Sequence, residues 1–541
     1  MQRLTSDLRR TILQGLRSQA RHASIVVFVL GAAFLTACQG PRTFVPQVMD
    51  TTSDRTLRAA SQWVIASEPG VRRPPFRFSS VDDRFLDEVA RASFNYLWTV
   101  CDPLSGMVFD RSSVRIASVA GVGFQLAAFP GAVERGWITR EQASERAARI
   151  LRTLESDPSN RKAGMFYHFV DARTAAPADG DAVSTIDSAL LFAGMIVAGE
   201  YFGGEVAERC SRLFSAANWS FFVLNDPRPN EPYLKGFVSL GWKPTRFADP
   251  TGDGALLPYA WADAADEQRL VCFLAAAAPN PAHRVDPIVY YRLRRMLGES
   301  DGSGVHVWFP WSGALFTHFF AQCFIDYAAM GADNPGAHGV PHRPRVDWWE
   351  NARRGVQLHR AKALRNPLGV PTLGVNAWGL SACDSAGGYA VPGVFPARIP
   401  TLDQVPQIDF ADFTPKDDFG DGTIAPYAAG CSLLFEPEAA IAALRYYRGL
   451  AGSDGRPLVW RELGGGASGG EGGSGFQDSF NLGTNWVAPD CVAIDQGPLV
   501  LAIENARSGL VWRLFMRNQW VRDAGNALGL RANRVRPDQT R

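Results

Sequence analysis

The sequence lacks any strong excess of charge and any paired-cysteine motif. Its 541 residues carry a formal net charge of +1, and 20% of them are charged. This balance provides no broad basic face for nucleic acid. Eight cysteines occur, but none forms a C-x-x-C pair, so neither a zinc knuckle nor a thioredoxin-type redox site is indicated. Most lie in apolar stretches, where cysteine serves as a small hydrophobic residue.

Common catalytic motifs are missing as well. There is no phosphate-binding G-x-x-x-x-G-K-[ST] and no H-E-x-x-H metal motif. A G-x-S-x-G match at residues 466–470 lies inside a glycine run, without the strand and helix that a nucleophile elbow needs. The DPTGDG segment from Asp249 has Ala260 at position twelve, where an EF-hand needs Glu. We therefore expect no metal and no organic cofactor.

Alternating β patterns are scarce, and helical patterns dominate from residue 81 onward. Some segments are amphipathic, such as TREQASERAARILRTLES, where Thr139 and Gln142 form a capping box. Others, such as STIDSALLFAGMIVAGEYF, are apolar on nearly every side and must be buried on every side. Their alternation predicts concentric layers, an all-α toroid in one large domain at residues 81–526. A helical solenoid is the alternative, but no repeat period supports it. Short strands are expected near residues 304–309 and 458–462.

The N-terminus carries a targeting signal. Several arginines precede the apolar run SIVVFVLGAAFLTA, which is too short for a comfortable membrane span. The tetrapeptide LTAC that ends at Cys38 resembles a bacterial lipobox, in which this cysteine is lipidated. A plain secretory signal is the alternative. We predict a signal peptide at 1–37, a tether and lead-in at 38–80 and a tail at 527–541. Because Gln39, and not Asp, follows Cys38, we expect the lipoprotein to be sorted to the outer membrane, where it faces the periplasm.

Carboxylates at the ends of apolar helices, beside aromatic loops, are the candidates for chemistry. Glycoside hydrolysis needs one protonated and one ionised carboxyl group across the scissile bond. Burial against aromatic residues raises one pKa, and hydrogen bonds hold the other down. Structural explanations compete: Asp495 could cap its helix, Asp421 fits a turn, and Glu504 is expected to pair with an arginine on a neighbouring helix. The candidates are Asp187, Glu267, Asp384, Asp421, Asp478 and Asp495.

Long ordered motifs then point to a family. The strings VERGWITREQASERAARILRTL, GMFYHFVD, WGLSACDS and IDQGPLVLAIENARSGLVWRLFM resemble the bacterial glucoamylase-like domain. That family includes endo-β-1,2-glucanases, and related domains occur in cyclic β-1,2-glucan synthases. The resemblance runs from about Val81 to Met516. It implies an (α/α)6 barrel and hydrolysis of β-1,2-glucan with inversion.

The resemblance also implies roles for individual residues. Glu267 would be the general acid and Asp495 the general base, with Asp478 the next candidate for base. Asp187, in the S-T-I-D motif, would line the sugar subsites. The remaining residues expected in the sugar cleft are Tyr167, His168, Trp311, Trp378, Asp384 and Asp421. The sequence departs from the family pattern after Glu267 and just before S-T-I-D, where it has Val183, so the glucan linkage and chain length stay open.

The combined prediction is a lipid-anchored glycoside hydrolase of the cell envelope that acts on a β-glucan, with β-1,2-glucan as the expected substrate. Two alternatives remain open: a retaining β-glucan transglycosylase and a non-catalytic glycan-binding lipoprotein. The catalytic carboxyl groups of inverting enzymes stand roughly 6.5–9.5 Å apart, and those of retaining enzymes about 5 Å.

Overall fold

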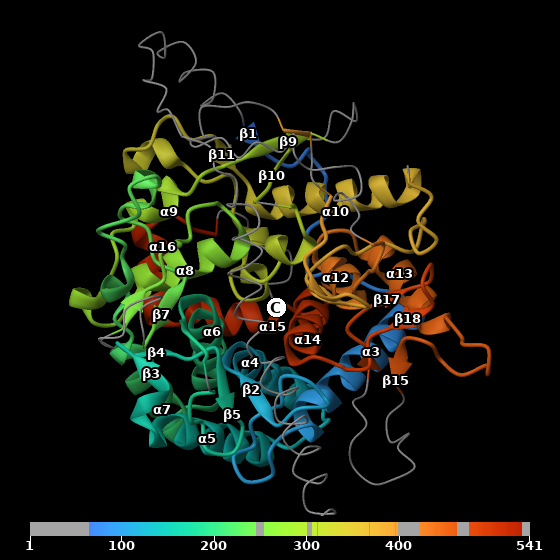
Figure 1. The fold of residues 1–541 in the computed structure, drawn as a ribbon, viewed down its shortest axis with the longest axis horizontal. Coiled ribbons are helices and arrows are strands. Elements are labelled where there is room, and N and C mark those ends of the chain that lie inside the picture. The colour runs from blue at the N-terminus through green and yellow to red at the C-terminus, as the bar shows by residue number, and fades with distance from the viewer. Residues whose placement is uncertain are drawn as a thin grey trace, which may run out of the picture.

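The chain folds into two concentric rings of helices (Figure 1). This computed structural model describes residues 64–532, apart from positions 179, 245–253, 300–305, 311, 367, 395–396, 399–420 and 462–474. Cys38, the signal peptide and most of the tether lie outside the described residues, as do the glycine run and the EF-hand-like segment.

The inner ring consists of elements that are apolar on nearly every side. In chain order they are α4 (Val119–Glu134), α6 (Thr185–Phe202), α8 (Asp266–Ala277), the 3-10 turns η5 (Leu315–His318) and η6 (Ala321–Cys323), α12 (Pro426–Cys431) and α14 (Ala493–Arg507). Helix α14 packs against α4 and so closes the ring. Nearly all residues of α4 and α6 are buried, as their composition predicts.

The outer ring consists of helices with one buried stripe. They are α3 (Ser80–Thr99), α5 (Arg140–Ser156), α7 (Gly204–Ala216), α10 (Trp348–Arg365), α13 (Pro437–Gly449) and α16 (Gln519–Ala527), with the short α9 (Ile288–Arg292) beside α8. The predicted capping box of Thr139 and Gln142 is present at the start of α5. Six inner positions, of which the described residues fill five with helices and one with 3-10 turns, make the toroid an (α/α)6 barrel.

Two glycines permit the closest approach between inner helices. A Cβ on Gly194 of α6 would lie 1.9 Å from the carbonyl oxygen of Gly123 in α4. A Cβ on Gly123 would meet the backbone of Leu190 at 2.4 Å. A side chain at either position would fit only if the two helix backbones moved apart, so α4 and α6 need glycine at both positions.

Small sheets join the helices, and several surround one end of the barrel. The strands are β1 (Val64–Ile65), β2 (Ile116–Ser118), β3 (Arg161–Lys162), β4 (Met165–Phe166), β5 (Phe169–Asp171), β6 (Val183–Ser184), β7 (Gly241–Lys243), β8 (Ala255–Leu256), β9 (Leu297–Glu299), β10 (His306–Trp308), β11 (Arg345–Val346), β12 (Cys383–Ser385), β13 (Gly388–Ala390), β14 (Ala397–Arg398), β15 (Trp460–Arg461), β16 (Gly475–Phe476), β17 (Phe480–Asn481) and β18 (Trp486–Val487). Strands β10 and β15 fall where short strands were predicted. Because β1 pairs with β11, the end of the lead-in belongs to the folded body.

The C-terminal ends of the inner helices are covered. Helix α15 (Leu510–Arg517) packs against α4, α6 and α14. Glu504, near the end of α14, accepts a 3.0 Å hydrogen bond from Arg135 at the end of α4, which confirms its predicted structural pairing with an arginine. Among the described residues, α6 alone is long and apolar enough to cross a membrane, but 83% of it is buried in the protein, as in a core helix.

Candidate active site

A cavity of about 90 Å³ lies at the N-terminal ends of the inner helices. Each inner helix contributes a side chain from its first turns or from the residue before it. These side chains are Ser118 before α4, Asp187 on α6, Glu267 on α8, Tyr427 on α12 and Asp495 on α14. The positive end of each helix dipole therefore faces the cavity, where it favours negative charge.

Glu267 is the acid on the α8 side of this cavity. It lies in the first turn of α8, half-buried, and among the described residues no hydrogen-bond donor reaches its carboxyl group. Burial raises the pKa of Glu267 to about 8, and the nearby carboxylates of Asp187 and Asp266 add to the rise. Glu267 is thus a neutral acid at pH 7, able to donate a proton.

Asp478 and Asp495 form a carboxyl pair on the α14 side. Oδ2 of Asp478 accepts a 2.6 Å hydrogen bond from the amide of Asp384, and the hydroxyl oxygen of Ser479 lies 3.1 Å from it. Oδ2 of Asp495 is buried and meets no donor among the described residues. Burial raises both pKa values: that of Asp478 to about 6, and that of Asp495 well above its usual range because Asp478 lies beside it.

The hydrogen bonds decide where the proton of this pair resides. The amide of Asp384, which donates to Asp478, stabilises the ionised form of that carboxyl group. Asp495 receives no such hydrogen bond, and its own hydroxyl can donate to Asp478, with which it stands in hydrogen-bonding reach. At neutral pH the pair therefore carries a single negative charge, centred on Asp478. The two groups titrate as one unit.

Asp187 and His168 occupy the α6 side of the cavity. The hydroxyl of Ser184, the N-cap residue of α6, donates to Oδ2 of Asp187. Nε2 of His168 lies 3.5 Å from Oδ1 of Asp187. The imidazole stacks on Phe169 at 3.8 Å between ring centroids. These contacts fix the Asp187 carboxylate next to Glu267.

The structure brings most of the predicted site residues together. Glu267, Asp495, Asp478, Asp187, His168 and Asp384 all line the cavity. Asp495 does not cap its helix, because Val492 is the N-cap residue and no side chain bonds the first turn. The alternative role proposed for Asp495, a helix cap, is therefore wrong.

Three other predicted residues lie elsewhere. Trp378 is only 1% exposed and exchanges backbone hydrogen bonds with the hydroxyl of Tyr447, in the core. Tyr167 is buried beside β6 and does not line the cavity. Asp421 is exposed and accepts a 2.9 Å hydrogen bond from the amide of Thr423, as in a turn. Trp311 lies outside the described residues.

Sequence reasoning missed several cavity residues. The most important are Arg111, which pairs with Asp384, and Tyr389, which lies opposite Asp384 in the hairpin of β12 and β13. The two glycines that precede Tyr389 are a hairpin signal that could have revealed it. The other missed residues of the lining are Asp110, Ser118, Phe169, Ile186, Phe316, Phe320, Ala382, Cys383, Tyr427, Val492 and Ile494.

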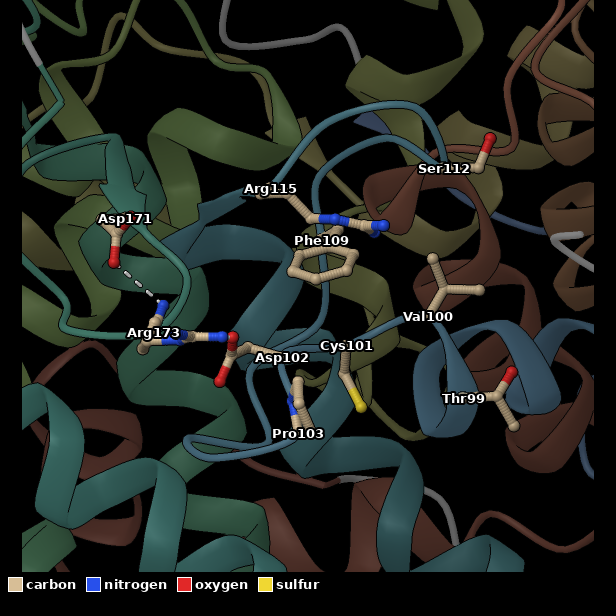
Figure 2. A pocket seen from close by; sticks show the side chains of 10 residues that line it. All are labelled: Thr99, Val100, Cys101, Asp102, Pro103, Phe109, Ser112, Arg115, Asp171 and Arg173. Carbon is tan, nitrogen blue, oxygen red and sulfur yellow. Dashed lines mark hydrogen bonds and ion pairs between the residues drawn. The ribbon is translucent and has the colours of Figure 1, made fainter. Parts of the chain in front are cut away.

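A second, larger hollow of about 550 Å³ lies on the surface beside the end of α3. As Figure 2 shows, Arg173 reaches between its two carboxylates. The guanidinium of Arg173 donates to Asp102 at 3.2 Å, and the amide of Arg173 donates to Asp171 at 3.0 Å. Both carboxylates already accept hydrogen bonds from Arg173, so this hollow lacks the free acid pair that hydrolysis requires.

Comparisons with known proteins show which families and folds this chain resembles. Residues 258–519 match the family model described as "Putative glucoamylase", and residues 88–188 match one described as a protein of unknown function, DUF3131. An exo β-1,2-glucooligosaccharide sophorohydrolase of Parabacteroides distasonis is 26% identical over 474 residues, which cover 81% of this chain. The chain spans 57% of that relative's length.

Solved structures share the fold. A glucoamylase-like protein of Bacteroides uniformis is 26% identical with a TM-score of 0.65, over 84% of this chain and 98% of that one. The endo-β-1,2-glucanase of Chitinophaga pinensis, solved with sophorotriose and glucose, is 24% identical with a TM-score of 0.63 over the same shares. These likenesses confirm the predicted (α/α)6 barrel.

Proposed function

We propose, on the premise that residues 258–519 belong to the glucoamylase-like family, that this protein is a glycoside hydrolase that cleaves β-1,2-glucan. The observation that carries the reaction class is the pairing of a neutral acid, Glu267, with a singly charged pair, Asp478 and Asp495, in one cavity. Glycoside hydrolysis requires this combination of one protonated and one ionised carboxyl group.

The positions of the acids in the ring support an inverting mechanism. Helix α8 bears Glu267 and α14 bears Asp495, and two ring positions separate them in either direction. The acid and the base thus face each other from opposite sides of the cavity. Such an arrangement suits the wider carboxyl separation of inverting enzymes, which leaves room for a water molecule.

The reaction then follows from these positions. Glu267 donates its proton to the glycosidic oxygen as the bond to the anomeric carbon breaks. A water molecule on the opposite face attacks that carbon and gives its proton to Asp478. The sequence favoured Asp495 as the base; the hydrogen bond from the amide of Asp384 favours Asp478, with Asp495 as the partner that carries the shared proton. Asp187, His168 and Asp384 are placed to bind sugar hydroxyls around the bond.

The β-1,2 linkage is supported by the relatives. The curated relative acts on β-1,2-glucooligosaccharides, and the solved Chitinophaga protein is an endo-β-1,2-glucanase. Both the relative at 26% identity and the structural neighbours cover more than four fifths of this chain. The chemistry of the cavity alone supports hydrolysis of a glycoside without choosing its linkage.

A panel of linkage-defined glucans tests this proposal. We expect release of products from β-1,2-glucan and none from β-1,3-, β-1,4-, β-1,6- or α-1,4-linked glucan. The first product seen by proton NMR should be the α-anomer, because inversion of a β-glycoside gives it. A β-anomer, or transfer to added acceptor sugar, would instead support the retaining transglycosylase. Binding of glucan without any product would support the non-catalytic lipoprotein.

We also propose that the protein is anchored to the outer membrane, facing the periplasm, through a lipid on Cys38. The basis is the LTAC motif after a short apolar run. Growth with radiolabelled palmitate should label the wild-type protein and leave Cys38→Ala unlabelled. Recovery of Cys38→Ala in the soluble periplasmic fraction, with the wild type in the outer membrane, is the expected result. Equal labelling of both proteins would refute lipidation at Cys38.

A further inference from the structure

The loop between α3 and α4 is fastened to the segment that leads into α14. Arg111 pairs with Val492 as an isolated β-bridge. The amide of Ala493 donates to the carbonyl of Asp110 at 2.8 Å. The hydroxyls of Ser112 and Ser113 donate to the two carboxylate oxygens of Asp490 at 2.6 and 2.8 Å. These hydrogen bonds fix the backbone of Arg111 against the segment that immediately precedes α14, the helix that carries Asp495.

The side chain of Arg111 extends from this fixed loop into the cavity. Its guanidinium forms a close ion pair with Asp384, and its Nε lies 3.7 Å from a carboxylate oxygen of Asp110. Asp384 in turn presents its amide to Asp478 at 2.6 Å, while the hydroxyl of Ser479 donates to the carbonyl of Asp384 at 2.6 Å. Arg111 therefore braces the residue whose backbone stabilises the ionised member of the carboxyl pair.

Among the described residues, the charged groups that face this carboxyl pair are Arg111 and Asp384, with Asp110 behind them. The neighbouring thiols and phenols, whose pKa values burial raises, stay neutral; they are Cys383, Cys431, Cys491, Tyr389 and Tyr427. One guanidinium thus faces several carboxyl groups. Its positive charge favours ionisation of Asp478, and the charge of Asp384 opposes it.

We propose that Arg111 is a positioning residue that holds Asp384 against Asp478 and supplies the positive charge that keeps the Asp478–Asp495 pair ionised and ready to accept a proton. The proposal deepens the hydrolase function proposed above and rests on it for its kinetic consequences. Arg111 contacts no reacting atom in this scheme. It acts through the carboxylate that receives the proton of water.

Two substitutions should displace the acidic limb of the kcat/KM profile in opposite directions. Arg111→Gln removes the cation, so the carboxyl pair holds its second proton to higher pH and the limb moves up. An opposite charge at close range is worth about 1–3 pH units. Asp384→Asn removes the opposing negative charge and leaves Arg111 in place, so the limb moves down. Arg111→Lys keeps a positive charge, so its acidic limb should lie close to that of the wild type.

The experiment measures kcat/KM on β-1,2-glucooligosaccharides from pH 4 to 9 for these variants. Arg115→Gln is the matched control, because Arg115 belongs to the same loop but lies over Phe109 at the outer hollow shown in Figure 2. Its limb should coincide with that of the wild type. A loss of activity in Arg111→Gln that is equal at every pH, with the limb unmoved, would overturn the proposal. If Arg111→Gln fails to fold, the two other variants test the proposal. The acidic limb of Asp384→Asn should then lie at lower pH than that of the wild type, and the limb of Arg111→Lys should lie close to it; limbs that do not move in this way would overturn the proposal.

A measurement without substrate separates this proposal from the proposed function. The infrared absorption of protonated carboxyl groups, taken as the difference between each protein and its Asp495→Asn counterpart, reports the pair directly. Arg111→Gln should keep this band to higher pH than the wild type. If the wild type hydrolyses no β-1,2-glucan, the proposed function fails while the infrared titration still tests Arg111. An unchanged titration in Arg111→Gln would refute the role of Arg111 even in an active enzyme.

Discussion

Replacing Glu267 by glutamine should remove the proton donor while it preserves the shape of the cavity. Burial and neighbouring carboxylates raise the pKa of Glu267 from 4.5 to about 8. Such a rise corresponds to about 5 kcal/mol in favour of the neutral acid. At pH 7 roughly 90% of the enzyme then carries a protonated Glu267, whereas an unperturbed glutamic acid would be protonated in less than about 1% of molecules. Glutamine holds no proton that it can donate.

The expected loss in kcat/KM on β-1,2-glucooligosaccharides is about 10²–10⁴-fold, the usual contribution of a general acid. A 4-nitrophenyl β-sophoroside needs little protonation of its leaving group, so its hydrolysis should fall much less. In the wild type, kcat/KM should also decline above about pH 8 as Glu267 ionises, and this alkaline limb should vanish in the variant. An alkaline limb that persists in Glu267→Gln, or equal losses on both substrates, would refute the assignment of Glu267 as the acid.

Three further predictions concern other residues of the cavity. Asp478→Asn should lower kcat/KM more than Asp495→Asn, because Asp478 is the member of the pair that accepts the amide hydrogen bond of Asp384 in its ionised form; an equal or reversed order would make Asp495 the base. Asp187→Asn should move the alkaline limb to lower pH, since the charge of Asp187 helps to raise the pKa of Glu267; an unmoved limb would contradict this. Tyr389→Phe removes a hydroxyl from the lining of the cavity and should lower kcat/KM about twofold to tenfold, the effect of losing one hydrogen bond to the substrate. Circular dichroism should show an unchanged fold.

The layered fold could be predicted because the distribution of apolar residues around a helix shows which of its sides are buried. A helix such as α6, apolar on every side, has no solvent-facing stripe and can lie only inside a ring. Helix α5 shows one stripe and a capping box, and both are found in the structure. The inner position filled by η5 and η6 could not be predicted, because those short turns lack the periodicity of a helix.

The site was predictable where function follows from position on a helix, and not where it depends on contacts between distant segments. Asp187, Glu267 and Asp495 each open an apolar helix, and all three reach the cavity. Trp378 was expected in the sugar cleft from the family resemblance, but it is buried in the hydrophobic core. Arg111 precedes Asp384 by 273 residues, and no local pattern links such a pair.

The packing inside the barrel limits the routes by which a substrate could reach these acids. Phe124 of α4 stacks on Phe324 at 5.7 Å and meets Phe320 at 5.8 Å between ring centroids. Gly497 of α14 lies so close to Phe124 that a Cβ there would approach it to 2.3 Å. These aromatic side chains fill the inside of the ring and α15 packs across its far end, so the described residues leave no tunnel through the barrel. The proposed substrate would therefore have to enter and leave through the end lined by helix N-termini, where the proposed acid and base both lie.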